Sequence, residues 1–189
     1  MSRRRLVRNR AAMGGLIVLG GIALMAILAD VIAIEPVSTF DIPSAGLPPF
    51  SEGHILGTDD IGRDVFSRIV RGSRISLTIG FSAVSISMVV GSLLGLLAGY
   101  FGRWPDTLIS RVLDVMLACP GLLLALTVVA SLCPGLRNAM LALGIAGIPF
   151  YARVVRGTTL AARDQVYVRA ARAIGMSDLR IMFRHILPN

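Results

Sequence analysis

The chain alternates between long apolar stretches and polar segments, and this pattern predicts a polytopic membrane protein. Four stretches are candidates for membrane-spanning helices, running roughly over Ala11–Ala33, Arg74–Tyr100, Ile109–Leu132 and Ala139–Val155. At a rise of about 1.5 Å per residue, a helix over each of them can cross a hydrocarbon layer of about 30 Å. We therefore expect an all-α bundle of transmembrane helices.

The same pattern divides the chain into three parts. Residues 1–33 hold a basic N-terminus and the first span, residues 34–73 form a polar segment beyond it with an amphipathic helix, and residues 74–189 form a core of three spans and a closing amphipathic segment. The first apolar run is about 20 residues long and no clean cleavage site follows it, so we interpret it as an uncleaved span and not as a signal peptide.

Glycines in the second span predict a packing surface. Gly91, Gly95 and Gly99 recur at every fourth residue. This spacing places them on one face of a helix, where the lack of side chains lets a neighbouring helix approach closely.

Prolines and glycines also predict irregular points in the last two spans. Pro120 and Gly121 are expected to break or kink the third span, and Gly144, Gly147 and Pro149 interrupt the fourth. Backbone groups freed at Pro120, Gly121 and Pro149 are candidates to line a translocation path, and a packing kink without solute contact is the alternative.

The polar segment ends in HILGTDDIGRDVFSRIVRGSRISL, which predicts an amphipathic helix that leads into the second span. Thr58 or Asp59 can cap such a helix, which we expect to begin near Asp60. The set His54, Asp59, Asp60 and Asp64 fits no established pattern of metal ligands. We therefore expect a capped surface helix with salt bridges here, and no metal site.

The segment after the fourth span predicts two short helices that meet at a glycine. Val166, Ala170 and Ile174 form one apolar stripe, and Gly175 can supply the left-handed residue that ends the first helix. Ser177 or Asp178 can start the second helix.

The apolar face expected for that second helix consists of Leu179, Met182, Phe183 and Ile186, and Pro188 lies near its end. The pair is too polar to span a membrane and too amphipathic for a plain loop. It needs a lipid surface or a protein groove.

Composition and charge strengthen the membrane interpretation and orient the chain. The sequence is 54% hydrophobic and 16% charged, its mean hydropathy is +0.75, and its net charge is +8, with arginine as its only positively charged side chain. Arginines and aromatic residues do not interleave as nucleic-acid binding would require. With the N-terminus inside, 14 arginines lie on the inner side and five on the outer side, so the positive-inside rule favours a cytoplasmic N-terminus and a cytoplasmic closing segment.

Several motifs, in order, resemble one family of membrane proteins. Ala170-Ala171, then Gly175, then Leu187-Pro188 resemble the cytoplasmic "EAA" loop of binding-protein-dependent ABC transporter permeases. GTDDIGRDVFSRIVRGSRISL, GSLLGLLAGYFG, RVLDVMLACPGLLLAL and RAARAIGMSDLRIMFRHILPN look like the peptide and nickel branch, in the subunit type with a long external loop after its first span.

This resemblance implies a type I importer permease fold in a bacterial inner membrane. It further implies two ATPase subunits, a second homologous permease and an external solute-binding protein as partners. The loop residues expected to contact the ATPase are Arg169, Ala170, Ala171, Gly175, Ser177, Asp178, Leu187 and Pro188. ATP would be used by the partner, because a phosphate-binding P-loop needs a lysine that this chain lacks, so we expect no enzymatic activity and no cofactor bound to the chain itself.

The sequence departs from the family pattern in two places. Arg169 stands where the family has a glutamate, which reverses the charge there. Family members also continue with two spans beyond this loop, so four of six expected spans are present before Asn189. One hypothesis is therefore a truncated remnant or membrane scaffold that does not transport.

Two alternatives concern the chemistry. An intramembrane enzyme would use Asp30 or Asp114, but no serine–histidine pair or nucleophile elbow accompanies them. Within the transport hypothesis, nickel or another small solute is the alternative to dipeptides and oligopeptides, which are the commoner substrates of the branch.

Overall fold

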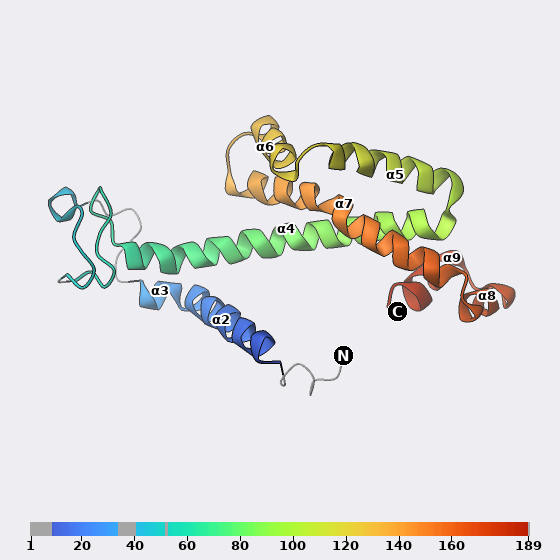
Figure 1. The fold of residues 1–189 in the computed structure, drawn as a ribbon, viewed down its shortest axis with the longest axis horizontal. Helices are drawn as coiled ribbons and strands as arrows, with labels where there is room; N and C mark the ends of the chain where they lie inside the picture. The colour runs from blue at the N-terminus through green and yellow to red at the C-terminus, as the bar shows by residue number, and fades with distance from the viewer. Residues whose placement is uncertain (1–8, 34–40, 52, 189) are drawn as a thin grey trace. The chain divides into compact units, whose positions relative to one another are not determined.

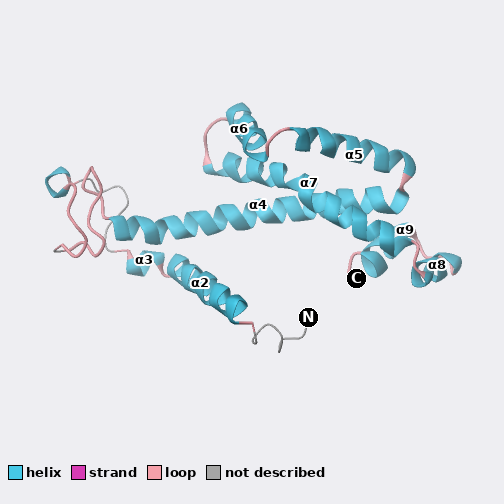
Figure 2. Cartoon of the chain, in the orientation of Figure 1, coloured by secondary structure: helices cyan, strands magenta, loops and turns pink. Residues whose placement is uncertain are grey.

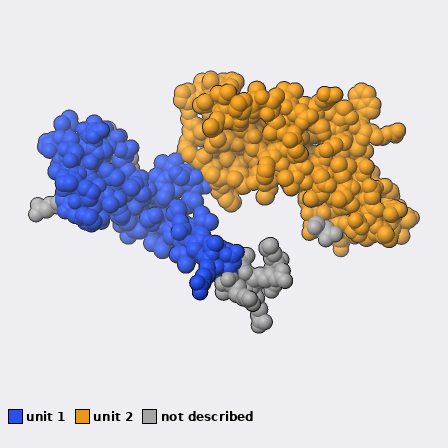
Figure 3. All heavy atoms as spheres, viewed as in Figure 1, with its two compact units in different colours: residues 1–78 blue, residues 79–189 orange. Residues whose placement is uncertain are grey.

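The computed structural model describes residues 9–33, 41–51 and 53–188, and the regular structure in these ranges is helical. Figure 2 shows the helices and the loops that join them. The chain forms two compact units, Met1–Thr78 and Ile79–Asn189, which Figure 3 colours separately. The all-α prediction is confirmed. The arginines at positions 3, 4, 5 and 8, on which part of the predicted orientation rests, lie outside the described residues.

The first unit begins with the predicted first span. Helix α2 covers Arg10–Ile27, and the Asn9 side chain accepts hydrogen bonds from the amides at its first turn. A short helix α3, Ala29–Ile32, follows after a break at Leu28. A 3₁₀ turn, η1, covers Ile42–Ser44 beyond the undescribed residues 34–40.

Helix α4 runs without interruption over Val65–Phe101, and Figure 1 shows it in green. Its first turn is capped by Asp64, whose Oδ2 accepts a hydrogen bond from the Ser67 amide at 2.7 Å. The predicted start near Asp60 is therefore wrong by about one turn. The amphipathic helix and the second span are one element.

The reason for the later start lies in the turn before it. The Asp59 carboxylate accepts hydrogen bonds from the amides of Ile61 and Arg63, and Gly62 has φ +77°. The chain therefore reverses at the point where the helix was expected. The Thr58 hydroxyl, the other predicted cap, donates to the Ser44 carbonyl and accepts from the Leu47 amide.

The polar side chains of this segment pair with one another. Arg63 and Arg68 both form ion pairs with Asp59, and His54 lies 3.1 Å from the Asp64 carboxylate. Within the described ranges, no group of three histidine, cysteine or acidic side chains could hold a metal ion.

The second unit contains the rest of α4 and the remaining helices. Their bounds are α5 Arg103–Ala118, α6 Gly121–Leu132, α7 Leu136–Arg163, α8 Val166–Ala173, α9 Asp178–Ile181 and a π-helical turn η2 Met182–Ile186. Helices α5 and α6 meet at an angle of 94°. The expected break at Pro120–Gly121 is confirmed, and the third stretch is not one straight helix.

Length and apolar character make α2, α4 and α7 candidates to cross a membrane, and the bent pair α5–α6 adds a fourth if it acts as one span. This agrees with a polytopic membrane protein. The three-part division at residues 33 and 73 stays a prediction, since the two compact units meet within α4.

Helices α4 and α7 pack closely along the predicted glycine face. A side chain at Gly91 would place its Cβ 2.7 Å from the Ile148 carbonyl oxygen, and one at Gly99 would lie 2.7 Å from Thr159 Cβ. The Ser87 hydroxyl donates to the Gly144 carbonyl at 2.6 Å. The packing prediction is confirmed.

The fourth span is longer and more regular than predicted. Pro149 lies inside α7 and is buried, and the helix continues through it. Gly144 and Gly147 lie against Ile86 and Ser87 of α4, so they are contact points between helices and do not interrupt the span.

Candidate coupling surface

The closing segment forms a compact loop of short helices, α8, α9 and η2, which we call the α8–η2 loop. Gly175 ends α8 with φ +79°. Its amide donates to the Arg172 carbonyl, and the Met176 amide donates to the Ala171 carbonyl. These two bonds form a Schellman motif, which favours glycine at the left-handed position. The predicted role of Gly175 as a helix end is confirmed.

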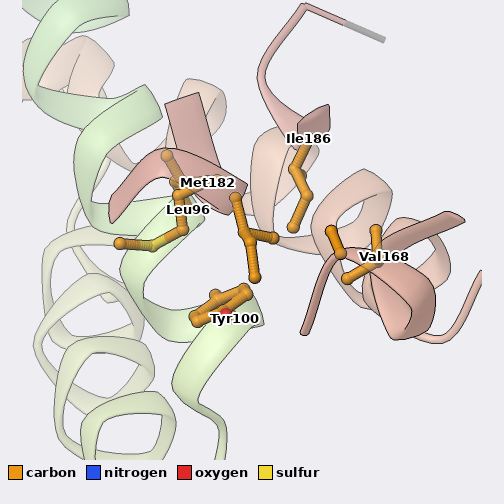
Figure 4. Packing of buried hydrophobic residues seen from close by; sticks show 7 residues of the cluster. Leu96, Tyr100, Val168, Met182 and Ile186 are labelled. Carbon is orange, nitrogen blue, oxygen red and sulfur yellow. The ribbon is translucent and has the colours of Figure 1, made fainter. Parts of the chain in front are cut away.

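The inner side of the α8–η2 loop is anchored on α4 by an apolar cluster, shown in Figure 4. Its buried members come from α4, α8, α9 and η2: Leu96, Tyr100, Val168, Ala171, Ile181, Met182 and Ile186. Each increment of about 100 Å² of apolar surface that is buried contributes roughly 2.5 kcal/mol. The seven buried side chains of this cluster therefore hold the loop firmly on α4.

Polar contacts at the end of α4 reinforce this anchor. The Tyr100 hydroxyl donates a hydrogen bond to the Asp178 carboxylate at 2.5 Å, next to the start of α9. The Arg172 guanidinium of α8 lies 5.4 Å from the centre of the Tyr100 ring, a cation–π arrangement. The Tyr100 side chain also raises the pKa of Arg172. One side chain at the end of α4 thus contacts both helices of the loop.

The outer side of the loop is apolar and exposed. Val166 is 75% exposed and Ile174 is 78% exposed, so two members of the predicted stripe face away from the cluster, and Ala170 between them is exposed too. In the second helix, Leu179 is 65% exposed. The buried side of α8 is instead formed by Val168 and Ala171.

The predicted face of the second helix is partly wrong. Met182 and Ile186 are buried as expected, but Leu179 and Phe183 are exposed and Ile181 takes their place. The π-helical turn over residues 182–186 has a period longer than 3.6 residues, so a face drawn at the α-helical period shifts.

The remaining predicted site residues are all exposed. Arg169 and Ser177 are exposed, and Ser177 makes no side-chain cap bond to α9. Leu187 and Pro188 are exposed and follow directly on η2. Pro120 and Gly121, at the break between α5 and α6, are exposed as well.

Sequence reasoning singled out Asp114 but missed the two ion pairs between α5 and α7. Arg156 makes two hydrogen bonds to the Asp106 carboxylate, at 2.5 and 2.8 Å, and Arg153 makes one to Asp114 at 2.9 Å. A pocket of about 350 Å³ lies between the two pairs. The acid and its arginine are 39 or 50 residues apart, and only Asp114 and Arg153 fall within predicted apolar stretches, so no signal in the sequence pointed to the Asp106–Arg156 pair.

Two known protein families match this chain, one at each end. The family "binding-protein-dependent transport system inner membrane component" matches residues 91–189, which include the α8–η2 loop. The "N-terminal TM domain of oligopeptide transport permease C" matches residues 1–49.

Similar proteins carry peptide transport names. A dipeptide transport system permease protein of Alkalihalophilus pseudofirmus is 45% identical over 98% of this chain and 61% of its own length. A glutathione transport system permease protein of Pectobacterium atrosepticum is 44% identical over 98% and 62%, and a dipeptide permease protein of Haemophilus influenzae is 44% identical over 96% and 63%. The chain spans about three fifths of the length of these relatives. With one family matching both the closely packed α4–α7 region and the anchored loop, the chain belongs to the inner membrane components of binding-protein-dependent transport systems.

Proposed function

We propose that this chain is a membrane subunit of an ATP-driven importer for small peptides, and that the α8–η2 loop docks on a separate ATPase. The observation that carries the proposal is the two-sided character of this loop. Its inner side is buried against α4, while Val166, Ile174 and Leu179 present an apolar outer surface. An exposed apolar patch bordered by charged residues is typical of a protein–protein contact.

The contacts of the loop couple its movement to that of α4 and α7. Its apolar cluster and the Tyr100–Asp178 hydrogen bond join it to the end of α4, and α4 packs against α7 through backbone contacts at Gly91 and Gly95. A rigid element on a tightly packed helix pair moves that pair as a unit. Closure of an ATPase dimer against the loop would therefore shift α4 and α7 together.

The names of the relatives favour peptides over nickel as the solute, since they refer to dipeptides, peptides and glutathione. The arginine distribution favours a cytoplasmic N-terminus and a cytoplasmic loop. ATP hydrolysis would take place in two ATPase subunits, and a second permease and an external binding protein would complete the system. The chain itself would carry no catalytic group.

The test is a double substitution on the outer surface, Val166→Ser with Ile174→Ser, in the assembled transporter. Both side chains are at least 75% exposed, so the subunit should fold normally. We expect co-purification of the ATPase and ATP-dependent dipeptide uptake to fall at least tenfold. This corresponds to a loss of about 1.4 kcal/mol, which is modest for apolar residues at the centre of an interface.

The matched control is Trp104→Ser. Trp104 lies in the first turn of α5 and is 85% exposed, but it is outside the loop. Wild-type ATPase binding in the double variant, or an equal loss in the Trp104 control, would contradict docking through the outer surface of the loop.

A further inference from the structure

The pocket between α5 and α7 is lined by Ser110, Leu113, Asp114, Arg153 and Arg156. Its two ion pairs differ in character. The Asp106–Arg156 pair is bidentate and largely shielded, with side-chain exposures of 20% and 34%. The Ser110 hydroxyl also donates to Asp106 at 3.2 Å. This pair holds α5 against α7.

The second pair is open. Asp114 and Arg153 are 60% and 61% exposed and share one hydrogen bond, between Arg153 Nη2 and Asp114 Oδ1. Asp114 Oδ2 makes no hydrogen bond or ion pair with the side chains and backbone of the described ranges. The Asp114–Arg153 pair therefore has spare acceptor and donor capacity facing outward from α5 and α7.

The depth of the pair decides what that outward face can meet. Arg153 lies near the inner end of the apolar stretch Ala139–Val155, ten residues before α7 ends at Arg163. Charged side chains are unfavourable against lipid tails, and near the end of a span they can reach water or other protein. A water-soluble solute can therefore reach the open pair from the inner side.

The end of α5 adds a third polar element beside the pair. The helix stops at Ala118, one turn beyond Asp114, and the chain turns by 94° into α6. The last carbonyls of a helix lack partners within it and carry the negative end of its dipole. They favour a cation at the same end of α5 where the Asp114 carboxylate lies.

We propose that Asp114, Arg153 and the end of α5 form a binding site for the two charged termini of a zwitterionic peptide. Arg153 binds the carboxylate of the solute, and Asp114 with the α5 carbonyls binds its ammonium group. The neighbouring pocket of about 350 Å³ is within the range of small-ligand sites. This inference rests on the proposed importer function and assigns a site to its solute. The other occupant of such a face, the second permease subunit, is an outcome of the test.

The test measures protection of a cysteine in the pocket of the complete transporter, without the external binding protein. Ser110→Cys supplies the reporter, and the two native cysteines, Cys119 and Cys133, are both exposed and are replaced by serine. The purified transporter is treated with a charged thiol reagent in the presence of dialanine, dialanine amide or N-acetyl-dialanine. We expect dialanine to slow labelling, and each blocked analogue to need at least a tenfold higher concentration.

Two substitutions at the open pair provide the decisive comparison. In Arg153→Gln, the concentration of dialanine for half-maximal protection should rise at least tenfold, and the difference between dialanine and its amide should disappear. In Asp114→Asn, the difference between dialanine and its N-acetyl form should disappear instead. Arg153→Lys, which keeps the charge, should retain part of the protection. Since both side chains are mostly exposed, thermal unfolding of the variants should match that of the parent.

Three results would overturn the site. The first is equal protection by dialanine and both analogues. The second is unchanged protection in both Arg153→Gln and Asp114→Asn. The third is a reporter cysteine that the reagent does not label and that instead cross-links to the second permease. If wild-type transporter still imports dialanine with ATP in any of these cases, the importer function stands and only the site fails. If wild type does not import dialanine at all, the proposed function fails first.

Discussion

The contact between α4 and α7 gives a quantitative prediction at Gly95. A Cβ added there would lie 2.9 Å from the Arg156 amide nitrogen and 3.0 Å from Val155 Cβ, and nearer still to the Ala152 carbonyl oxygen. Ordinary contacts of this kind are about 3.5–4.0 Å, so Gly95→Ala must push the two helices apart by roughly 0.5–1 Å. Two of the three clashing atoms belong to the backbone and cannot rotate away.

The expected cost follows from two opposing effects. Overpacking of a tight interface costs about 1–3 kcal/mol, and alanine in place of glycine within a helix returns up to about 1 kcal/mol. We expect Gly95→Ala to be net destabilising by about 1–2 kcal/mol. Gly80→Ala is the matched control, because Gly80 lies in the same helix with no atom within 4 Å of the added Cβ. This control should be neutral or stabilised by up to about 1 kcal/mol.

The assay is equilibrium unfolding of the reconstituted subunit by steric trapping in lipid nanodiscs. The free energies of unfolding of the two variants should differ by about 1–3 kcal/mol, with Gly95→Ala the less stable. Stabilities that agree within about 0.5 kcal/mol would refute the close approach of α4 and α7 at this glycine.

Three further predictions concern the loop and the polar segment before α4. Tyr100→Phe removes the hydroxyl that donates to Asp178 and should lower ATP-driven uptake more than ATPase binding, which separate measurements of transport and co-purification can distinguish. Gly175→Val should uncouple ATP hydrolysis from uptake while Gly175→Asn is tolerated, because the surrounding space is empty and only the left-handed backbone resists a side chain; normal coupling in the valine variant would contradict this. The Arg63 amide, followed by its guanidinium, lowers the pKa of Asp59 to about 2, from 3.8. The contribution of the ionised Asp59 carboxylate to stability should thus be complete above about pH 4 and lost as pH falls towards 2. Hydrogen exchange of the Arg63 amide should show this loss in wild type but not in Asp59→Asn.

Regular patterns in the sequence were sufficient for much of the fold. The four apolar stretches predicted the α-helical membrane class because helix length and bilayer thickness are set by local geometry. The glycine face of α4 and the left-handed position of Gly175 were also predictable, since each depends on the absence of a side chain at one point of the backbone. The motifs shared with the permease family pointed to the same loop that the family match covers.

Other features depended on contacts between residues distant in the chain. The start of α4 moved to Val65 because Asp59 bonds the turn that follows it, and Asp64 became the cap. Several acidic residues in this stretch could cap a helix, so composition alone could not choose among them. Leu179 and Ile181 exchanged their predicted sides because the π-helical turn and the packing on α4 set the rotation of the segment.

The Asp114–Arg153 pair shows most clearly what the sequence alone could not predict. The sequence by itself placed Asp114 and Arg153 near the ends of two apolar stretches. Only the tertiary structure decided that the two are partners, because α5 and α7 run side by side after the sharp turn into α6 (Figure 1). Local sequence fixes which backbone conformations are favourable, whereas the pairing of side chains 39 residues apart depends on the packing of whole helices.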